Sequence, residues 1–404
     1  MQSRRTSEIK EAIMKNWIQL QKTMREKISE KMIVSSPPSI FIGSYSYPKV
    51  SIGPLVSTFN EDTALFDHPE EWAGQSLEDI IKYRLSLIRG TNPTTVNIAS
   101  NNDKLIETLQ ELTMAIKSTN IEVNFAKKPI FNFDEIKKNG VTDSDSIHYG
   151  LASKINDLKL PSGLIVDKKI EKAYYDKDLK AIEAVTKLYD EGIEISKLSK
   201  ALSIGMIGIQ KNRRIVPTKW SITAIDQILS SELIKKIKNF DSVNFYQVYN
   251  YSHLDNTYSI ILIPDKTWCF EMHEAWIDNT GNVEIETDIE VAGKLRNYPR
   301  MGGSFFAARV AVSEYLVQNR KSAGIMVFRE IQPQYLLPVG VWQIREGIRK
   351  AMRKGPRVFD SLEKALINAC STMSVSKKEW ISNSNLLRFV KNQRRIQDYF
   401  DKTQ

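Results

Sequence analysis

The chain has 404 residues, of which 42% are hydrophobic, so it is long enough to bury a core and to form two domains. Its only two cysteines, Cys269 and Cys370, exclude a disulfide framework and a zinc site built from cysteine thiolates, and no run of 18 apolar residues predicts a membrane span. The net charge of +9 is concentrated at the C-terminal end, where 14 Lys and Arg against 6 Asp and Glu give residues 341–404 a net charge of +8, which favours nucleic acid as a partner.

The first predicted element is a long amphipathic helix over residues 6–33, in a segment 1–34 that we treat as a separate N-terminal part. Apolar side chains recur from Ile9 to Met32 in steps of three and four, which is typical of a packing face. Pro37-Pro38 ends the helix, and two short β-type runs follow at 40–42 and 50–52.

Helices and strands then alternate. Helices are predicted over 76–89, 104–118 and 174–191, strands over 94–98 and 121–125, and a loop over 139–163. Residues 243–290 predict an antiparallel sheet with a hairpin turn at 278–282, and only helices are predicted beyond Gly302-Gly303, over 305–320, 341–354, 361–371 and 384–392. The sequence therefore predicts an α+β fold with two domains: a mixed N-terminal domain with an antiparallel sheet (35–292) and a mainly helical C-terminal domain (293–390), followed by a tail (391–404).

The tail carries a short motif of the form Gln-x-x-aliphatic-x-x-aromatic-aromatic, made by Gln393, Ile396, Tyr399 and Phe400. This spacing places the three apolar side chains on one side of a single helical turn, where they form one plug, while the glutamine amide remains for a hydrogen bond. The motif resembles the PCNA-interacting box, by which replication and repair proteins bind the sliding clamp. The alternative is that the same side chains close a helix onto the parent domain.

Basic residues form the second signal. On the helix over 341–354, Arg345, Arg349 and Arg353 recur every four residues and form a ridge beside Lys350, which suits a row of phosphates. The alternative is a solvated helix face.

Two further groups are candidate nucleic-acid contacts. Arg213, Arg214 and Lys219 lie beside Trp220, before a helix that we expect to begin after Ser221. Lys49 follows two tyrosines at 45 and 47, which suits phosphate binding and base stacking. A salt-bridged turn and a tyrosine-lined hairpin are the alternatives.

Four stretches, together with the tail motif, resemble the archaeal Nre DNA-repair family: PPSIFIGSYSYPKVSIGPL (37–55), RRIVPTKWSIT (213–223), HEAWIDNTGNVEI (273–285) and GGSFFAARVAVSEYL (302–316). The resemblance spans residues 35–404 and implies an Nre N-terminal domain, an Nre C-terminal domain and a role in DNA repair together with the clamp. It implies Gln393, Ile396, Tyr399 and Phe400 as the clamp contacts. Many members begin with a cysteine-rich, zinc-finger-like segment, and this chain departs from them because it has the helix from Ile9 to Met32 there instead.

The leading hypothesis is a DNA-repair factor that the clamp recruits through the tail while the basic C-terminal region contacts DNA. Such a protein is expected to be cytoplasmic and nucleoid-associated, to have other repair proteins as candidate partners, and to need no membrane, metal or cofactor. The alternative is an enzyme acting on nucleic acid or a nucleotide, with a phosphate pocket of Arg213, Arg214, Lys49 and His273. No phosphate-binding loop, zincin pair or hydrolase elbow occurs, and the enzyme question stays open.

Overall fold

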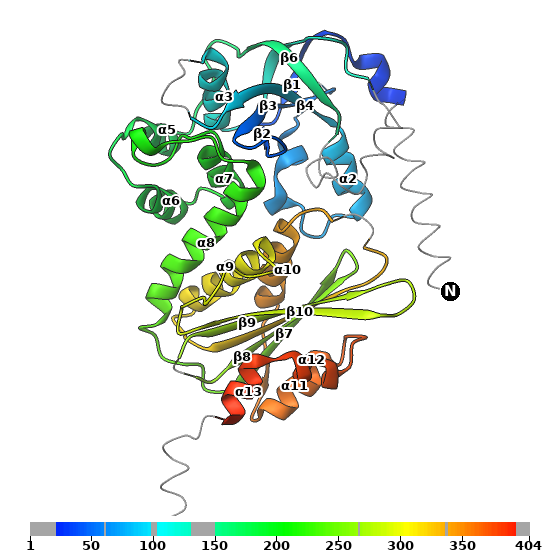
Figure 1. Cartoon of the computed structure of the whole chain (residues 1–404), viewed down its shortest axis with the longest axis vertical. Helices are drawn as coiled ribbons and strands as arrows, with labels where there is room; N and C mark the ends of the chain where they lie inside the picture. The colour runs from blue at the N-terminus through cyan, green and yellow to red at the C-terminus, as the bar shows by residue number, and fades with distance from the viewer. Residues whose placement is uncertain are drawn as a thin grey trace, which may run out of the picture. The chain divides into compact units, whose positions relative to one another are not determined.

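The computed structural model describes residues 22–59, 62–97, 103–130, 150–265, 267–335 and 338–392. These residues form two compact units, each with a six-stranded sheet (Figure 1). Unit 1 contains the described residues up to Leu229 together with 338–343, and unit 2 contains 230–335 together with 344–392. Two helices, α8 (Thr218–Ile237) and α10 (Trp342–Arg353), continue from one unit into the other.

The sheet of unit 1 has the strand order β1-β5-β6-β4-β3-β2. Its strands are β1 (Lys31–Ser36), β2 (Ile40–Gly43), β3 (Lys49–Ser57), β4 (Leu87–Thr95), β5 (Thr119–Phe125) and β6 (Ala152–Lys159). Neighbours are antiparallel except β4 and β6. Two glycines allow β3 and β4 to approach closely, because a Cβ atom on Gly53 would lie 1.9 Å from the carbonyl oxygen of Gly90.

Three of the helices of unit 1 begin where the sequence supplies a capping side chain. The helices of this unit are α2 (Leu77–Leu85), α3 (Lys104–Met114), α5 (Lys168–Tyr175), α6 (Ala181–Asp190), α7 (Ile195–Ser203) and the 3₁₀ turns η1 (Ala64–Asp67), η2 (Pro69–Glu71) and η3 (Gln210–Asn212). Ser76, Asp103 and Asp167 accept hydrogen bonds from the first-turn amides of α2, α3 and α5.

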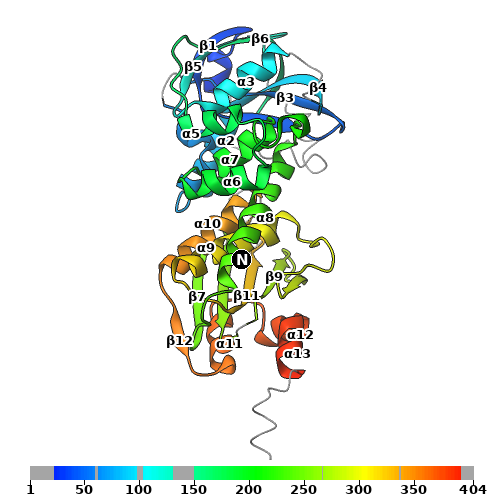
Figure 2. The ribbon, with the colours of Figure 1, turned by 90° about the vertical axis from the view of Figure 1, so that its left-hand side faces the viewer.

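The sheet of unit 2 has the order β10-β9-β11-β8-β7-β12, with β9 and β11 parallel and the other neighbours antiparallel. Its strands are β7 (Tyr246–His253), β8 (Asn256–Ile263), β9 (Cys269–Ile277), β10 (Val283–Val291), β11 (Gly324–Ile331) and β12 (Arg357–Phe359). Helices α9 (Gly303–Gln318) and α10 cover one face, and α11 (Leu362–Cys370), α12 (Lys377–Asn383) and α13 (Asn385–Asn392) cover the other (Figures 1 and 2).

The expectation of a mainly helical C-terminal domain is wrong, because residues 293–390 contribute β11 and β12 to this sheet. β11 is buried at every residue, since helices cover both faces of the sheet. A strand covered on both faces has no period-two alternation, and its apolar run was therefore not recognised as a strand.

Three predicted helices are also corrected. Of the helix expected over 6–33, residues 6–21 lie outside the described part, residues 22–27 are helical, and 31–36 form β1. The helix expected over 76–89 ends at Leu85, and the helix over 174–191 is divided into α5 and α6. Ser221 does not cap α8 but lies inside it, where its hydroxyl donates to the carbonyl of Ser199.

The hairpin turn at 278–282 is confirmed, and it joins β9 to β10. Within the described ranges, every helix is too short or too polar to pass through a lipid bilayer.

Candidate nucleic-acid interface

Two segments that are far apart in the sequence lie side by side in unit 1. The first, 44–49, contains the turn between β2 and β3 and the first residue of β3, and the second, 214–220, leads into the first turn of α8. The amide of Ile42 donates to Thr218 Oγ1 over 2.9 Å, and the rings of Tyr47 and Trp220 meet edge to face with centroids 4.9 Å apart. The structure thereby joins two groups of residues that the sequence presented as separate candidates.

The residues just after β4 hold both segments. The amide of Val96 donates to the carbonyl of Pro48 over 3.3 Å, and the carbonyl of Val96 accepts the amide of Ile215 over 2.9 Å. Asn97 forms an isolated antiparallel bridge with Arg214 and accepts a hydrogen bond from the Arg214 guanidinium. Backbone hydrogen bonds therefore position both segments.

We call the result the basic–aromatic surface, and it consists of Tyr45, Tyr47, Lys49, Arg214, Lys219 and Trp220. All three of its rings are exposed, by 91% for Tyr45, 53% for Tyr47 and 43% for Trp220. The three cationic side chains are exposed as well. On such a surface the cations can hold phosphates, and the exposed rings can stack on bases.

Arg213 was predicted as a member of this group, but its side chain is hydrogen-bonded to backbone carbonyls instead. Its guanidinium donates to the carbonyls of Gly208, Tyr174 and Asp176 over 2.7–2.8 Å, and it lies 5.5 Å from the centre of the Tyr174 ring. Burial lowers the pKa of Arg213, although a guanidinium remains charged at neutral pH. Arg213 therefore closes the C-terminal end of α5 and is not part of the surface.

The expected arginine ridge on α10 is interrupted, because residues 342–348 of this helix are all buried. Arg345 is only 2% exposed, and Arg349 donates to both carboxylate oxygens of Glu314 on α9 and to Glu346 over 2.6–2.7 Å. Lys350 is partly exposed and Arg353 is exposed. The cations that α10 presents to solvent are therefore at its C-terminal end.

The four predicted clamp contacts, Gln393, Ile396, Tyr399 and Phe400, lie outside the described residues. The helix that precedes them in the chain, α13, is anchored by a buried carboxylate that sequence patterns did not identify as a cap. Glu271 on β9 accepts the amides of Asn385 and Leu386 over 2.7 and 3.1 Å, and also the hydroxyl of Ser384.

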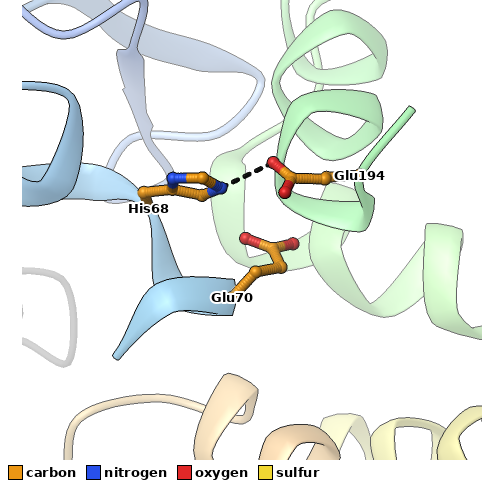
Figure 3. Close-up of side chains that lie close together, drawn as sticks. All are labelled: His68, Glu70 and Glu194. Carbon is orange, nitrogen blue, oxygen red and sulfur yellow. Dashed lines mark hydrogen bonds and ion pairs between the residues drawn. The ribbon is translucent and has the colours of Figure 1, made fainter. Parts of the chain in front are cut away.

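One group among the described residues has the spacing of a metal site. Ligand atoms of His68, Glu70 and Glu194 all lie within 4.8 Å of one another (Figure 3). His68 Nε2 lies 2.7 Å from Glu194 Oε2, a hydrogen bond that raises the pKa of His68, and Glu70 Oε1 accepts the amide of Ser196 over 2.9 Å. These hydrogen bonds connect the 3₁₀ turns η1 and η2 to the first turn of α7, and this structural role already explains why the three side chains lie together.

The pocket expected for an enzyme is not assembled from the predicted residues. His273 is fully buried in the core of unit 2, where Nδ1 contacts the hydroxyl of Thr287 over 2.9 Å and the ring lies 5.0 Å from that of Phe328. Lys49 and Arg214 are surface residues of unit 1.

The amino-acid sequence matches two family models, "Archaeal Nre, N-terminal" over residues 7–281 and "Archaeal Nre, C-terminal" over residues 290–399. The chain belongs to the archaeal Nre family. The family predicted from the four sequence stretches is therefore confirmed. No solved structure matches this Nre protein.

Its relatives in this family include three proteins named for DNA repair. DNA repair protein NreB of Archaeoglobus fulgidus is 35% identical over 380 residues, which cover 91% of this chain and 93% of the relative. DNA repair protein NreA of the same organism is 35% identical over 358 residues, 88% of each chain. DNA repair protein NreA of Haloferax volcanii is 32% identical over 326 residues, 78% of this chain and 76% of the relative.

Proposed function

We propose that this Nre protein is a DNA-repair factor that contacts DNA through its own basic residues and is recruited to DNA by the sliding clamp, PCNA. The name shared by the three Nre relatives supports the repair role. The junction of the turn 44–49 with the stretch 214–220 carries the DNA contact, because it gathers three exposed cations and three exposed rings on one surface. Such a factor would act at the nucleoid, in the cytoplasm.

The C-terminal end of α10 supplies a second DNA contact. Lys350 and Arg353 extend from this end, and the following residues Lys354 and Arg357 are exposed too. Each phosphate that a cation neutralises releases condensed counterions, which favours binding of any strand whatever its sequence. This C-terminal group replaces the longer ridge expected from the sequence, since Arg345 is buried and Arg349 is paired with Glu314.

Recruitment depends on the tail motif, in which Ile396, Tyr399 and Phe400 form the plug and Gln393 supplies the amide. Buried aromatic anchors provide most of the affinity of short peptides. Clamp binding would raise the local concentration of the repair factor on DNA, so that the DNA contacts themselves need only modest affinity.

Point substitutions test recruitment better than a deletion, because a deletion would also remove basic residues of the tail. We expect Ile396→Ala combined with Phe400→Ala to weaken clamp binding by at least about thirtyfold in calorimetry, since two anchors are lost. DNA affinity should stay unchanged, because no charge is removed. Lys402→Gln, outside the motif, is the matched control. Equal clamp affinity of the wild type and the double variant would contradict the proposal.

A further inference from the structure

Tyr45 has the most exposed ring among the large hydrophobic side chains of the described residues, at 91%. It belongs to the turn between β2 and β3, two residues from Tyr47, whose ring contacts Trp220. An aromatic ring that stays exposed to water does not contribute the favourable free energy that its burial would give to folding. An exposed ring near cationic side chains is typical of a surface that binds a planar ligand.

We infer that the basic–aromatic surface binds single-stranded DNA, with unpaired bases stacked on Tyr45 and Trp220 and phosphates held by Lys49, Arg214 and Lys219. The inference rests on the proposed DNA contact and narrows it to one class of strand. In a duplex, both faces of each base are already covered by the neighbouring pairs, so an exposed ring has no base face to stack on. In a single strand the faces are available, and every base has one.

Two of the three rings, Trp220 and Tyr47, are held in place before any strand binds. Trp220 lies in the first turn of α8, whose start is tied to β2 by the hydrogen bond between Ile42 and Thr218. Tyr47 packs on Trp220 at an interplanar angle of 62°, so the two rings restrict each other. A platform that is already ordered loses little conformational entropy when a base stacks on it.

The charges of this surface also suit a single strand. The three cations come from three places in the chain: Lys49 begins β3, Arg214 is bridged to Asn97 after β4, and Lys219 lies beside Trp220 in α8. The segments that carry these cations are the same ones that carry the rings or are hydrogen-bonded to them, so phosphate contacts and base contacts would fall on one surface.

The test compares a fluorescently labelled oligothymidylate with the same strand annealed to its complement, in anisotropy titrations of the full chain. We expect Tyr45→Ala and Trp220→Ala each to weaken single-strand binding by about tenfold. Tyr45→Phe and Trp220→Phe should retain it, since stacking needs the ring alone. Tyr298→Ala, at another tyrosine that is 66% exposed, is the matched control and should leave the affinity unchanged.

Tryptophan fluorescence adds a signature of stacking. Oligothymidylate should quench part of the emission of the wild type, and Trp220→Phe should lose that quenching while it keeps the affinity. Charge attraction alone would not couple the quenching to this one residue.

The outcomes separate the inference from the proposed function. If the wild type binds duplex as tightly as single strand, and the alanine variants lower neither affinity, the single-strand inference is overturned while the DNA contact stands. If single-stranded RNA of matching sequence binds more tightly than DNA, the assignment to DNA fails. If no nucleic acid binds even at low salt, the proposed DNA contact fails as well.

Discussion

Arg213 and Arg214 are adjacent in the chain, yet their guanidinium groups have different surroundings. Arg213 donates to several backbone carbonyls at the end of α5, while Arg214 is exposed and donates to the side chain of Asn97. The first arrangement satisfies carbonyls that a helix end leaves unpaired, and the second leaves a cation at the surface. At the scale of single residues, one arginine therefore stabilises the fold, and the other belongs to the proposed DNA contact.

We expect Arg213→Ala to lower the free energy of unfolding by about 2–4 kcal/mol, because several charge-assisted hydrogen bonds are lost. Arg214→Gln should change it by less than about 0.5 kcal/mol. Denaturant titrations measure this difference, and Arg214→Gln should instead weaken single-strand binding several-fold. Equal destabilisation by both substitutions would show that the two arginines are not divided in this way.

The sequence identified both arginines but could not separate their roles. Apart from Gly208, the carbonyl partners of Arg213 lie 37–40 residues upstream, and a run of basic residues carries no information about them. The same holds for Arg349, whose partner Glu314 lies 35 residues away on another helix. Tyr45 and Trp220, by contrast, could be selected from sequence because they stand beside cations in turns and helix starts.

The last described helix, α13, depends on a strand for its N-terminal cap. Its capping residue Ser384 accepts the amide of Leu387 in the usual way, but the amides of Asn385 and Leu386 are taken by Glu271 of β9. A carboxylate at this position also interacts favourably with the positive end of the helix dipole. At the scale of elements, a buried charge thus attaches the final helix to the sheet.

We expect Glu271→Ala to lower the free energy of unfolding by about 2–4 kcal/mol, since three donors lose a charged acceptor inside the protein. Glu271→Gln should cost less, because its amide oxygen can still accept. Glu284→Ala on β10 is the control for an exposed glutamate and should have little effect in the same thermal or denaturant unfolding. A neutral effect of Glu271→Ala would refute the capping role.

Elements with a clear pattern were predictable, and elements decided by tertiary contacts were not. β2, β3 and β5 were found from short β-type runs, and the hairpin at 278–282 from its turn residues. β6 was missed because ASKINDLK is polar over most of its length and follows a Gly- and Ser-rich stretch. α5 and α6 were merged because the residues between Tyr175 and Ala181 contain no glycine or proline.

At the scale of the whole molecule, cations in both compact units are proposed to share the DNA contact. Lys49, Arg214 and Lys219 belong to unit 1, and Lys350 and Arg353 belong to unit 2. Each phosphate that a cation neutralises contributes its own counterion release. The salt dependence of binding should therefore report the two sets separately.

We expect Gln substitutions of the three unit 1 cations to reduce the slope of log affinity against log salt by about 2 on a single strand. Gln substitutions of the two unit 2 cations should reduce this slope by about 1.4, and the variant that combines all five substitutions should reduce it by the sum of the two values. Lys168→Gln with Lys180→Gln, at exposed lysines paired with Glu171 and Glu183, controls for net charge. An unchanged slope in either set would remove that set from the DNA contact.

Of all the features of the fold, the division into two units was the hardest to predict from the sequence. The two Nre family models meet between residues 281 and 290, near the boundary predicted at 292, while the compact units divide within α8. β9 pairs with β11, which lies beyond that boundary, so the sheet of unit 2 draws strands from both family segments. Local patterns predict strands but not which strands share a sheet.

The attachment of α13 has a mechanical consequence. Under the proposed recruitment, a clamp that moves along DNA would pull on the tail, and the force would enter the fold through this helix. Glu271 passes it to β9, an inner strand held by ladders to β10 on one side and β11 on the other. Tension is then distributed over two rows of backbone hydrogen bonds, whereas a tether fastened to the short edge strand β12 would peel it from the sheet.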